Sequence, residues 1–252
     1  MRTSIAMESY KFWHQKASLY GILVLLGLMS YSAITTKVGP KQWIFEFGAT
    51  QWIVIILLAV GSSFWSMEYQ NHTITLLLYK QVNRRIIYGA KLVVILLYGV
   101  ALTCIATLVT FILKFLMVGQ RYDWLTTQIN QRPLITELLL NVCGTLIYAC
   151  FIVTLASLLI MLIRINAAVI GIGLAIGFLG AGISVALMAA LTPWSGILKW
   201  GPLNMIFITQ QLSNPSYTQI SHLTNPAIMG GTLAYAALFT WLGYLLFKHR
   251  HV

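Results

Sequence analysis

The chain has 252 residues, of which 59% are hydrophobic and only 8% are charged, and its mean hydropathy is +0.82. Because soluble domains are about 25% charged, this composition excludes a soluble globular protein, a disordered chain and a small disulfide-rich secreted protein. The sequence is therefore that of an integral membrane protein. We therefore interpret its formal net charge of +11 as a signal of orientation in the bilayer and not as a sign of nucleic-acid binding.

The first residues predict a short amphipathic helix on the membrane surface. Between residues 4 and 16, Ile5, Phe12 and Trp13 fall on roughly one face of a helix. Such a face suits a helix that lies in the membrane interface. An unspecialised cytoplasmic tail is the alternative interpretation.

Six apolar runs follow, each long enough to cross a bilayer as a helix. They cover residues 18–34, 49–67, 92–118, 138–163, 167–191 and 230–247. The runs are continuous and do not alternate, which excludes a transmembrane β-barrel. We therefore predict an all-α polytopic membrane protein with six transmembrane helices, and one transmembrane domain over residues 1–252.

Six spans place both termini on one side of the membrane, and the basic residues indicate which side. Ten of the 16 Lys and Arg residues fall on the side of the termini and six on the other side. Because basic residues are enriched in cytoplasmic connections, both termini are predicted to be cytoplasmic, in a multi-pass protein of the cell membrane.

Small residues in the fifth span indicate helix packing within one subunit, with a role in the dimer interface or the transport path as the alternative. Gly173, Gly177 and Ala181 recur at i, i+4 and i+8 in the fifth span, a stripe that lets another helix approach closely. The three cysteines also lie inside apolar runs and are expected as small core residues: Cys104, Cys143 and Cys150.

The outer connection before the last span, residues 192–229, is too apolar for a solvated loop. Residues 194–209 mix Trp, Leu, Ile and Phe with Gly201 and Pro202. This composition favours interfacial or partly re-entrant helices, whose interrupted backbone must be buried in protein.

No catalytic or nucleotide-binding motif is present. The sequence contains no HExxH, GxSxG or GxxxxGK[ST], and no Asp or Glu lies in the interior of a predicted span. We therefore expect no cofactor, no metal site and no enzymatic activity in this chain.

The cytoplasmic segment 67–91 has a pattern of its own. Ile74, Leu77 and Leu78 form one apolar face of a short helix, which has no core of its own to cover. Such a helix either lies on the membrane surface or docks into the groove of a partner protein. The residues alone favour neither interpretation over the other.

The order of residue types in this segment is similar to that of a known family. The matching residues are Glu68, Thr73, Leu77, Leu78, Asn83, Arg84 and Lys91. Together with the layout of the whole chain, they resemble the permease subunits of type-2 ATP-binding-cassette exporters, and most closely the lantibiotic-immunity and bacitracin-resistance permeases. Those permeases commonly have Gly where His72 stands and Pro–x–Ser at positions 81–83, so the loop geometry differs here.

The resemblance implies a partner for the segment. Thr73–Tyr79, including Ile74, would be a coupling helix seated in a separate ATP-binding-cassette ATPase, which would hold ATP and magnesium. Glu68, Arg84 and Arg85 would orient that helix through charge-assisted hydrogen bonds to the ATPase or to the N-terminal helix. For the two arginines, plain anchoring on the cytoplasmic side is the alternative.

The resemblance also implies export. Two permease subunits, identical or homologous, would move an amphipathic peptide or lipid-like substrate outward along the second and fifth spans. Ser62, Ser63 and Ser66 are the candidate polar lining of that path, with small packing residues as the alternative. A different interpretation of the chain is a non-transporting assembly factor or sensor partner that docks a regulator through the same segment.

Overall fold

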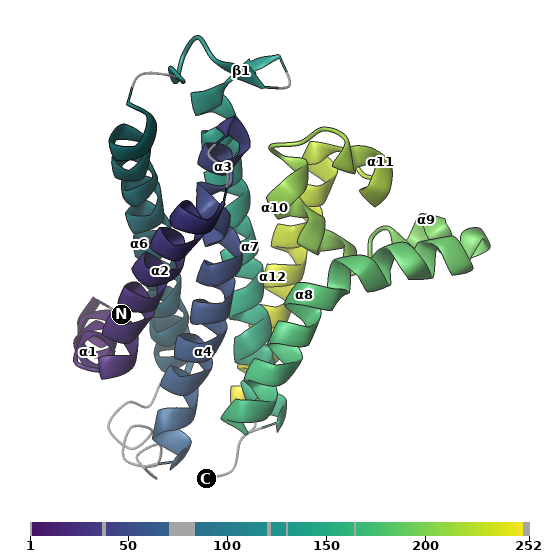
Figure 1. The fold of residues 1–252 in the computed structure, drawn as a ribbon. Helices are drawn as coiled ribbons and strands as arrows, with labels where there is room; N and C mark the ends of the chain where they lie inside the picture. The colour runs from purple at the N-terminus through teal and green to yellow at the C-terminus, as the bar shows by residue number, and fades with distance from the viewer. Residues whose placement is uncertain are drawn as a thin grey trace.

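The computed structural model describes residues 2–36, 39–70, 84–119, 122–129, 131–163 and 165–248. Within these residues, six helices are long and apolar enough to cross a bilayer (Figure 1). They are α2 (Lys16–Thr35), α4 (Ala49–Gln70), α6 (Arg84–Val118), α7 (Leu134–Ile163), α8 (Asn166–Ala190) and α12 (Asn225–Lys248). The prediction of an all-α polytopic membrane protein is confirmed.

Short elements occupy the two ends of the bundle. We call the end at which α4, α7 and α12 finish the lower end, and the opposite end the upper end (Figure 1). The N-terminal helix is α1 (Arg2–Trp13). The short elements in the upper half are α3 (Pro40–Ile44), η1 (Glu46–Gly48), the antiparallel pair β1 (Gln128–Ile129) and β2 (Arg132–Pro133), η2 (Thr192–Trp194), α9 (Ser195–Leu198), η3 (Asn204–Phe207), α10 (Ile208–Gln211) and α11 (Tyr217–Ser221).

Three of the helices begin well before the apolar runs that predict them. α6 begins at Arg84 and not at residue 92, α7 at Leu134 and not at residue 138, and α12 at Asn225 and not at residue 230. Apolar composition marks only the part of a helix that crosses hydrocarbon. The helical hydrogen-bond ladder continues beyond it into polar and charged residues.

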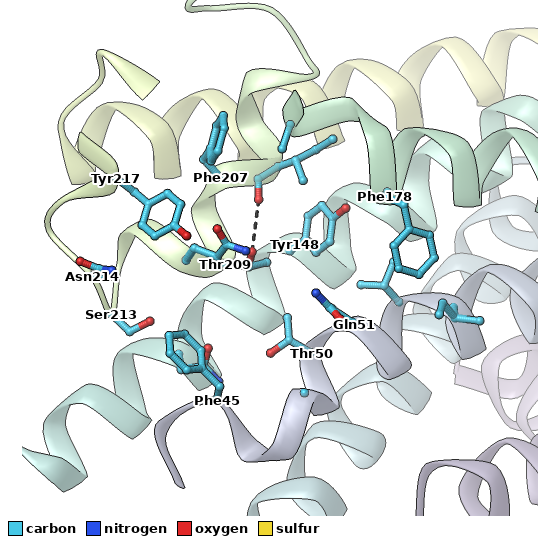
Figure 2. A pocket seen from close by; sticks show the side chains of 18 of the residues that line it. Phe45, Thr50, Gln51, Tyr148, Phe178, Phe207, Thr209, Ser213, Asn214 and Tyr217 are labelled. Carbon is cyan, nitrogen blue, oxygen red and sulfur yellow. Dashed lines mark hydrogen bonds between the residues drawn. The ribbon is translucent and has the colours of Figure 1, made fainter. Parts of the chain in front are cut away.

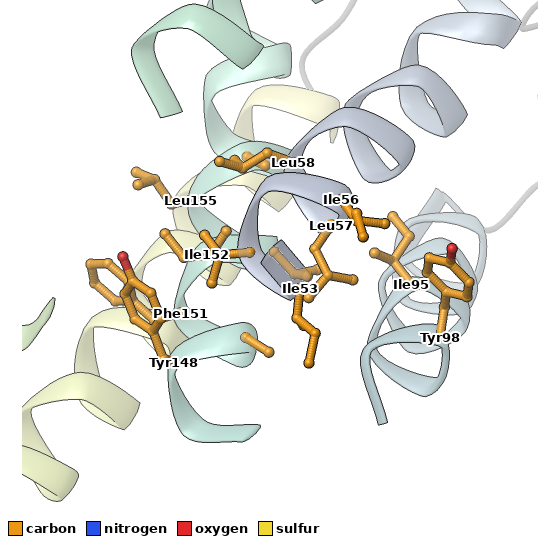
Figure 3. Packing of buried hydrophobic residues seen from close by; sticks show 14 of the residues in the cluster. Ile53, Ile56, Leu57, Leu58, Ile95, Tyr98, Tyr148, Phe151, Ile152 and Leu155 are labelled. Atoms are coloured by element: carbon orange, nitrogen blue, oxygen red, sulfur yellow. The ribbon is translucent and has the colours of Figure 1, made fainter. Parts of the chain in front are cut away.

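The core forms around α7, which packs against α12, α4 and α6. Figure 3 shows side chains of α4 enclosed between α6 on one side and α7 on the other. Leu57 is 1% exposed and Ile152 is 0% exposed. Because lipid tails are as apolar as these side chains, close packing and not the hydrophobic effect holds such helices together.

The prediction that the cysteines are core residues is wrong for two of them. Cys104 on α6 and Cys143 on α7 are exposed, and Cys150 is partly exposed. An apolar run in a membrane protein identifies a span but does not distinguish its lipid-facing side from its core-facing side, since both are apolar.

The outer segment, residues 192–224, is divided between surface and core. Trp194, Ile197 and Trp200 are exposed, whereas η3 and α10 are buried against α7, α8 and α12. In Figure 1, α9 projects beyond α8, while α10 and α11 lie beside the upper part of α12. This arrangement agrees with the expected partly embedded outer helices.

Candidate functional site

The predicted coupling segment is described only at its flanks. Its central residues lie outside the described residues: Thr73, Ile74, Leu77, Leu78 and Asn83. On one flank, Glu68 belongs to the last turn of α4. On the other, Arg84 opens α6. Both helix ends lie at the lower end of the bundle (Figure 1), so the contacts of α4 and α6 define what is attached to this segment.

The two arginines that open α6 contact the last helix. Arg84 Nη1 donates to the Lys248 carbonyl oxygen at 2.7 Å, and Arg85 Nε donates to the Tyr244 hydroxyl at 2.9 Å. The guanidinium of Arg85 also lies 5.4 Å from the centroid of the Tyr244 ring. The sequence offered the ATPase or the N-terminal helix as partners of these arginines. In the structure a contact partner of both arginines is α12, which the sequence did not suggest.

The N-terminal helix α1 buries a different set of residues from the predicted one. Ser4, Glu8 and Phe12, spaced four residues apart, form its buried side, and Ile5 packs partly against the core. Phe12 makes edge contacts with the rings of Phe64 at 5.1 Å and Tyr98 at 5.0 Å. Trp13 is 53% exposed. Trp13 lies about 100° around the helix from Phe12 and outside this buried side, so its place on a membrane-facing surface stays a prediction.

A buried ion pair attaches α1 to the two helices that flank the coupling segment. Lys91 of α6 is 1% exposed, and its Nζ lies 3.2 Å from Glu8 Oε2. The same ammonium lies 4.1 Å from the centroid of the Phe64 ring of α4 and donates to the Phe64 carbonyl oxygen at 3.5 Å. Lys11 binds the other carboxylate oxygen of Glu8 at 2.7 Å. One lysine thus joins α1, α4 and α6.

The three serines of α4 make hydrogen bonds within the bundle. Ser62 donates to the Leu58 carbonyl oxygen, and Ser66 donates to the Ser63 carbonyl oxygen at 3.1 Å. Ser63 Oγ accepts from Asn166 Nδ2 at 3.0 Å, which fastens α4 to the start of α8. None of the three lines the cavity described below. Their role as a substrate path stays a prediction.

The small-residue stripe of α8 faces α4. A Cβ placed on Gly173 would lie 2.6 Å from Leu58 Cδ2, so any larger residue there would force the Leu58 side chain to shift. A Cβ on Gly177 would make ordinary contacts, 3.7 Å from the Tyr148 hydroxyl and 4.0 Å from Val54. Ala181 packs partly against the core. The stripe therefore brings two helices of the same chain together.

A cavity of about 500 Å³ lies in the upper half, between α4, α7, α8 and the outer segment (Figure 2). Its wall includes Thr50, Gln51 and Val54 of α4, Asn141 and Tyr148 of α7, and Phe178 of α8. The outer segment adds Phe207 and Thr209. This upper cavity has the size of a small-molecule site.

Two buried polar groups face this cavity without a hydrogen-bond partner among the described residues. Asn141 is 1% exposed and its Nδ2 is unpartnered, and Tyr148 is 4% exposed and its hydroxyl is unpartnered. By contrast, Thr50 is paired with Thr145 across the α4–α7 contact at 2.8 Å. Since buried polar groups are nearly always hydrogen-bonded, these two groups are available to a partner inside the cavity, either water or a ligand.

Buried amides fix the part of the outer segment that closes the cavity. Asn204 Nδ2 donates to the carbonyl oxygens of Lys199 at 2.6 Å and Ser221 at 2.9 Å, and its Oδ1 accepts from Ser184 of α8 at 3.2 Å. Gln211 Nε2 donates to the Leu223 carbonyl oxygen at 2.8 Å. These bonds satisfy the backbone of an irregular segment, as burial requires.

Sequence reasoning did not identify Glu8–Lys91, Asn141 or Tyr148. For the ion pair no specific signal existed, because the predicted cytoplasmic side carries two acids, Glu8 and Glu68, and ten basic residues. For Asn141 and Tyr148, seven residues apart on one face of α7, the signal was two polar side chains inside an apolar run.

Comparison with known proteins identifies the family of the chain. A family model described as ABC-2 family transporter protein matches residues 4–182, which run from α1 into α8. A search of curated proteins returned no match to this sequence. The match covers most of the chain and includes both flanks of the predicted coupling segment. The chain therefore belongs to the ABC-2 transporter family, as a multi-pass membrane permease of the kind that carries no ATPase site of its own.

Proposed function

We propose that this chain is the membrane-spanning subunit of an ATP-driven exporter that moves an amphipathic peptide or lipid-like substrate out of the cell. A separate ATPase would supply the energy through residues 67–91, and a second permease subunit, identical or homologous, would complete the transporter. The finer relation to lantibiotic-immunity and bacitracin-resistance permeases belongs to this proposal as well.

The observation that carries the proposal is the position of the Lys91 contacts. The segment 71–83 leaves α4 after Gln70 and enters α6 at Arg84. Lys91 ties these two helices to each other and to α1, and Arg84 and Arg85 tie α6 to α12. A displacement of the segment would therefore be passed on to several helices together.

The mechanism follows from linkage. ATP can change the conformation of the permease only if the ATPase binds one arrangement of the two permease subunits better than another. Shifting such an equilibrium from 1:99 to 99:1 takes about 5.5 kcal/mol of differential affinity. The contacts at the lower end would connect the segment 67–91 rigidly to the bundle. The differential binding free energy would then move the helices and would not be lost in local deformation of the segment.

The coupling assignment can be tested with the ATPase subunit that assembles with this chain. We expect Leu77→Asp to weaken assembly at least tenfold, because about 2 kcal/mol or more is lost when a charge enters a buried apolar contact. Arg84→Ala should retain assembly but lower ATP turnover in the complex. The measurements are co-purification and the ATP hydrolysis rate of the complex in nanodiscs.

The matched control is Leu125→Asp. Leu125 is 70% exposed and lies in the connection between α6 and α7. The same substitution there should change neither assembly with the ATPase nor ATP turnover. If Leu77→Asp leaves assembly and turnover as they are in the unaltered complex, the segment is not the coupling element. The melting temperature of each variant shows whether the membrane domain itself is intact.

A further inference from the structure

We propose that the upper cavity binds an uncharged or anionic single-chain amphiphile, with an oxygen acceptor at Asn141 and Tyr148 and an apolar chain along α4 and α8. The proposal deepens the proposed function and rests on it, since it names the class of molecule that the exporter would carry. It also excludes cationic amphiphilic peptides from this site.

The walls of the cavity suit an apolar chain. Val54 and Leu58 of α4 and Phe207 of the outer segment line it and are buried. Phe178 of α8 also lines the cavity and is 57% exposed, so the cavity reaches the surface beside α8 (Figure 2). An apolar chain can therefore enter from the side of the bundle.

The polar groups specify the other end of the ligand. The Nδ2 of Asn141 can only donate a hydrogen bond, and the Tyr148 hydroxyl can donate one. Both lack a partner among the described residues. An unpaired buried donor costs about 1–3 kcal/mol, so a ligand gains affinity by presenting carbonyl, ester or carboxylate oxygens to these groups.

The charges of the lining select against cations. Among the described residues, Lys41 is the charged residue of the lining, and no Asp or Glu contributes to it. An ammonium group would bring no acceptor for Asn141 and Tyr148. It would also meet the like charge of Lys41, an exposed residue of the lining.

The available space limits the size of the ligand. The volume of about 500 Å³ lies within the range of about 300–1,000 Å³ found for small-molecule sites. Part of this space exists because residue 177 is glycine, whose missing side chain would point at the Tyr148 hydroxyl and Val54. A larger side chain at this position would occupy the site.

The test uses the full chain in nanodiscs without the ATPase, and three radiolabelled probes with the same dodecyl chain length. They are dodecanoyl glycerol, dodecanoate and dodecylammonium, and empty nanodiscs provide the blank for lipid partitioning. We expect saturable binding of the first two probes, with mutual competition. Dodecylammonium should bind at least about tenfold more weakly, which corresponds to about 1.4 kcal/mol.

Variants locate the binding site. Asn141→Leu and Tyr148→Phe should each lower the affinity for dodecanoyl glycerol about 3- to 10-fold, because each variant loses one hydrogen bond to the ligand. Gly177→Leu should abolish saturable binding. Its matched control is Gly171→Leu on the same helix, because a Cβ at Gly171 meets no atom within 4 Å and Gly171 does not line the cavity.

Three outcomes would overturn the proposal: equal or tighter binding of dodecylammonium, no saturable binding of any probe to the folded chain, or equal losses with Gly171→Leu and Gly177→Leu. Melting temperatures confirm that each variant is folded. Because no ATPase is present, these results are independent of the coupling test. A failure of ligand binding would overturn the assignment of the upper cavity, and a failure of the coupling test would overturn the role of residues 67–91.

Discussion

Lys91 places a full positive charge in the lower core, where removing an ammonium from water costs several kcal/mol. The carboxylate of Glu8 and the face of the Phe64 ring compensate for this cost at 3.2 and 4.1 Å. Glu8 is itself buried at 5% exposure. The pair therefore contributes to stability only while both partners are present.

Removing one partner of this pair should destabilise the protein more than removing its exposed neighbour. We expect Lys91→Met to lower the free energy of unfolding by about 2–3 kcal/mol, since it leaves a buried carboxylate with less compensation. Lys11→Met should cost less than about 1 kcal/mol, because the Lys11 side chain is 34% exposed. Thermal unfolding in nanodiscs measures both.

A double substitution distinguishes the ion pair from simple packing. Glu8→Gln combined with Lys91→Met removes both charges and should recover part of the loss. Additive losses in the double variant, or equal losses for Lys11→Met and Lys91→Met, would show that the pair has no special energetic role.

The sequence indicated where the candidate functional regions lie along the chain, but it did not indicate which residues contact each other in them. The apolar runs located the six spans, and the flanking charges indicated a candidate coupling segment. The partners of Glu8 and Arg85 could not be found, because Lys91 and Tyr244 lie far along the chain and only tertiary packing brings them together. Likewise, the sequence grouped Trp13 with Phe12 on one face of α1, whereas packing buries Phe12 and leaves Trp13 half exposed.

At the scale of elements, the contact between α4 and α8 depends on a glycine. The approach of Leu58 to Gly173 leaves no room for a methyl group unless Leu58 shifts, whereas Gly171, two residues earlier on the same helix, faces open space. The two positions on one helix therefore offer a direct comparison between packing and intrinsic helix preference.

Gly173→Ala should destabilise the bundle, although alanine is the better helix former. The added methyl group forces a shift of Leu58 that costs about 1–3 kcal/mol, against a gain of about 0.5–1 kcal/mol from helix preference. Gly171→Ala should gain stability or leave it unchanged. The measurement is the thermal unfolding midpoint of each variant.

Leu58→Ala tests the physical cause. In a double-mutant cycle, the combination of Gly173→Ala with Leu58→Ala should be less harmful than the sum of the two single changes. Strict additivity would place the origin of the Gly173→Ala effect elsewhere than in the contact with Leu58.

Element boundaries were less predictable than element identity. The small-residue stripe of α8 was visible in the sequence, but the helix that it contacts was not. The outer segment was recognised as partly embedded from its composition, yet the roles of Asn204 and Gln211 were not foreseen. Amide side chains in an irregular stretch resemble those of a solvated loop until their backbone partners are known.

For the whole molecule, orientation sets which end meets the ATPase. The proposal of cytoplasmic termini rests on ten basic residues against six. It places the lower end, with Lys91 and the flanks of the coupling segment, in the cytoplasm. It also places the upper cavity in the outer half of the bilayer.

Single cysteines report this orientation. In a background without Cys104, Cys143 and Cys150, a cysteine replacing Arg121 or Ser216 should react with a membrane-impermeant maleimide on intact cells, and one replacing Asn83 should not. Ser216 is exposed, so the reagent has access to it. The reverse labelling pattern would invert the topology and remove the coupling role of residues 67–91.

The contact of Arg84 and Arg85 with α12 also bears on the order in which the protein is made. A ribosome delivers α6 well before α12, and α7, α8 and the outer segment are synthesised in between. During this interval α6 is in the membrane without the Lys248 carbonyl and the Tyr244 hydroxyl. The lower end of α6 therefore acquires its final contacts only when the last helix is inserted. A nascent chain arrested before α12 would hold the two flanks of the coupling segment in an unfinished state.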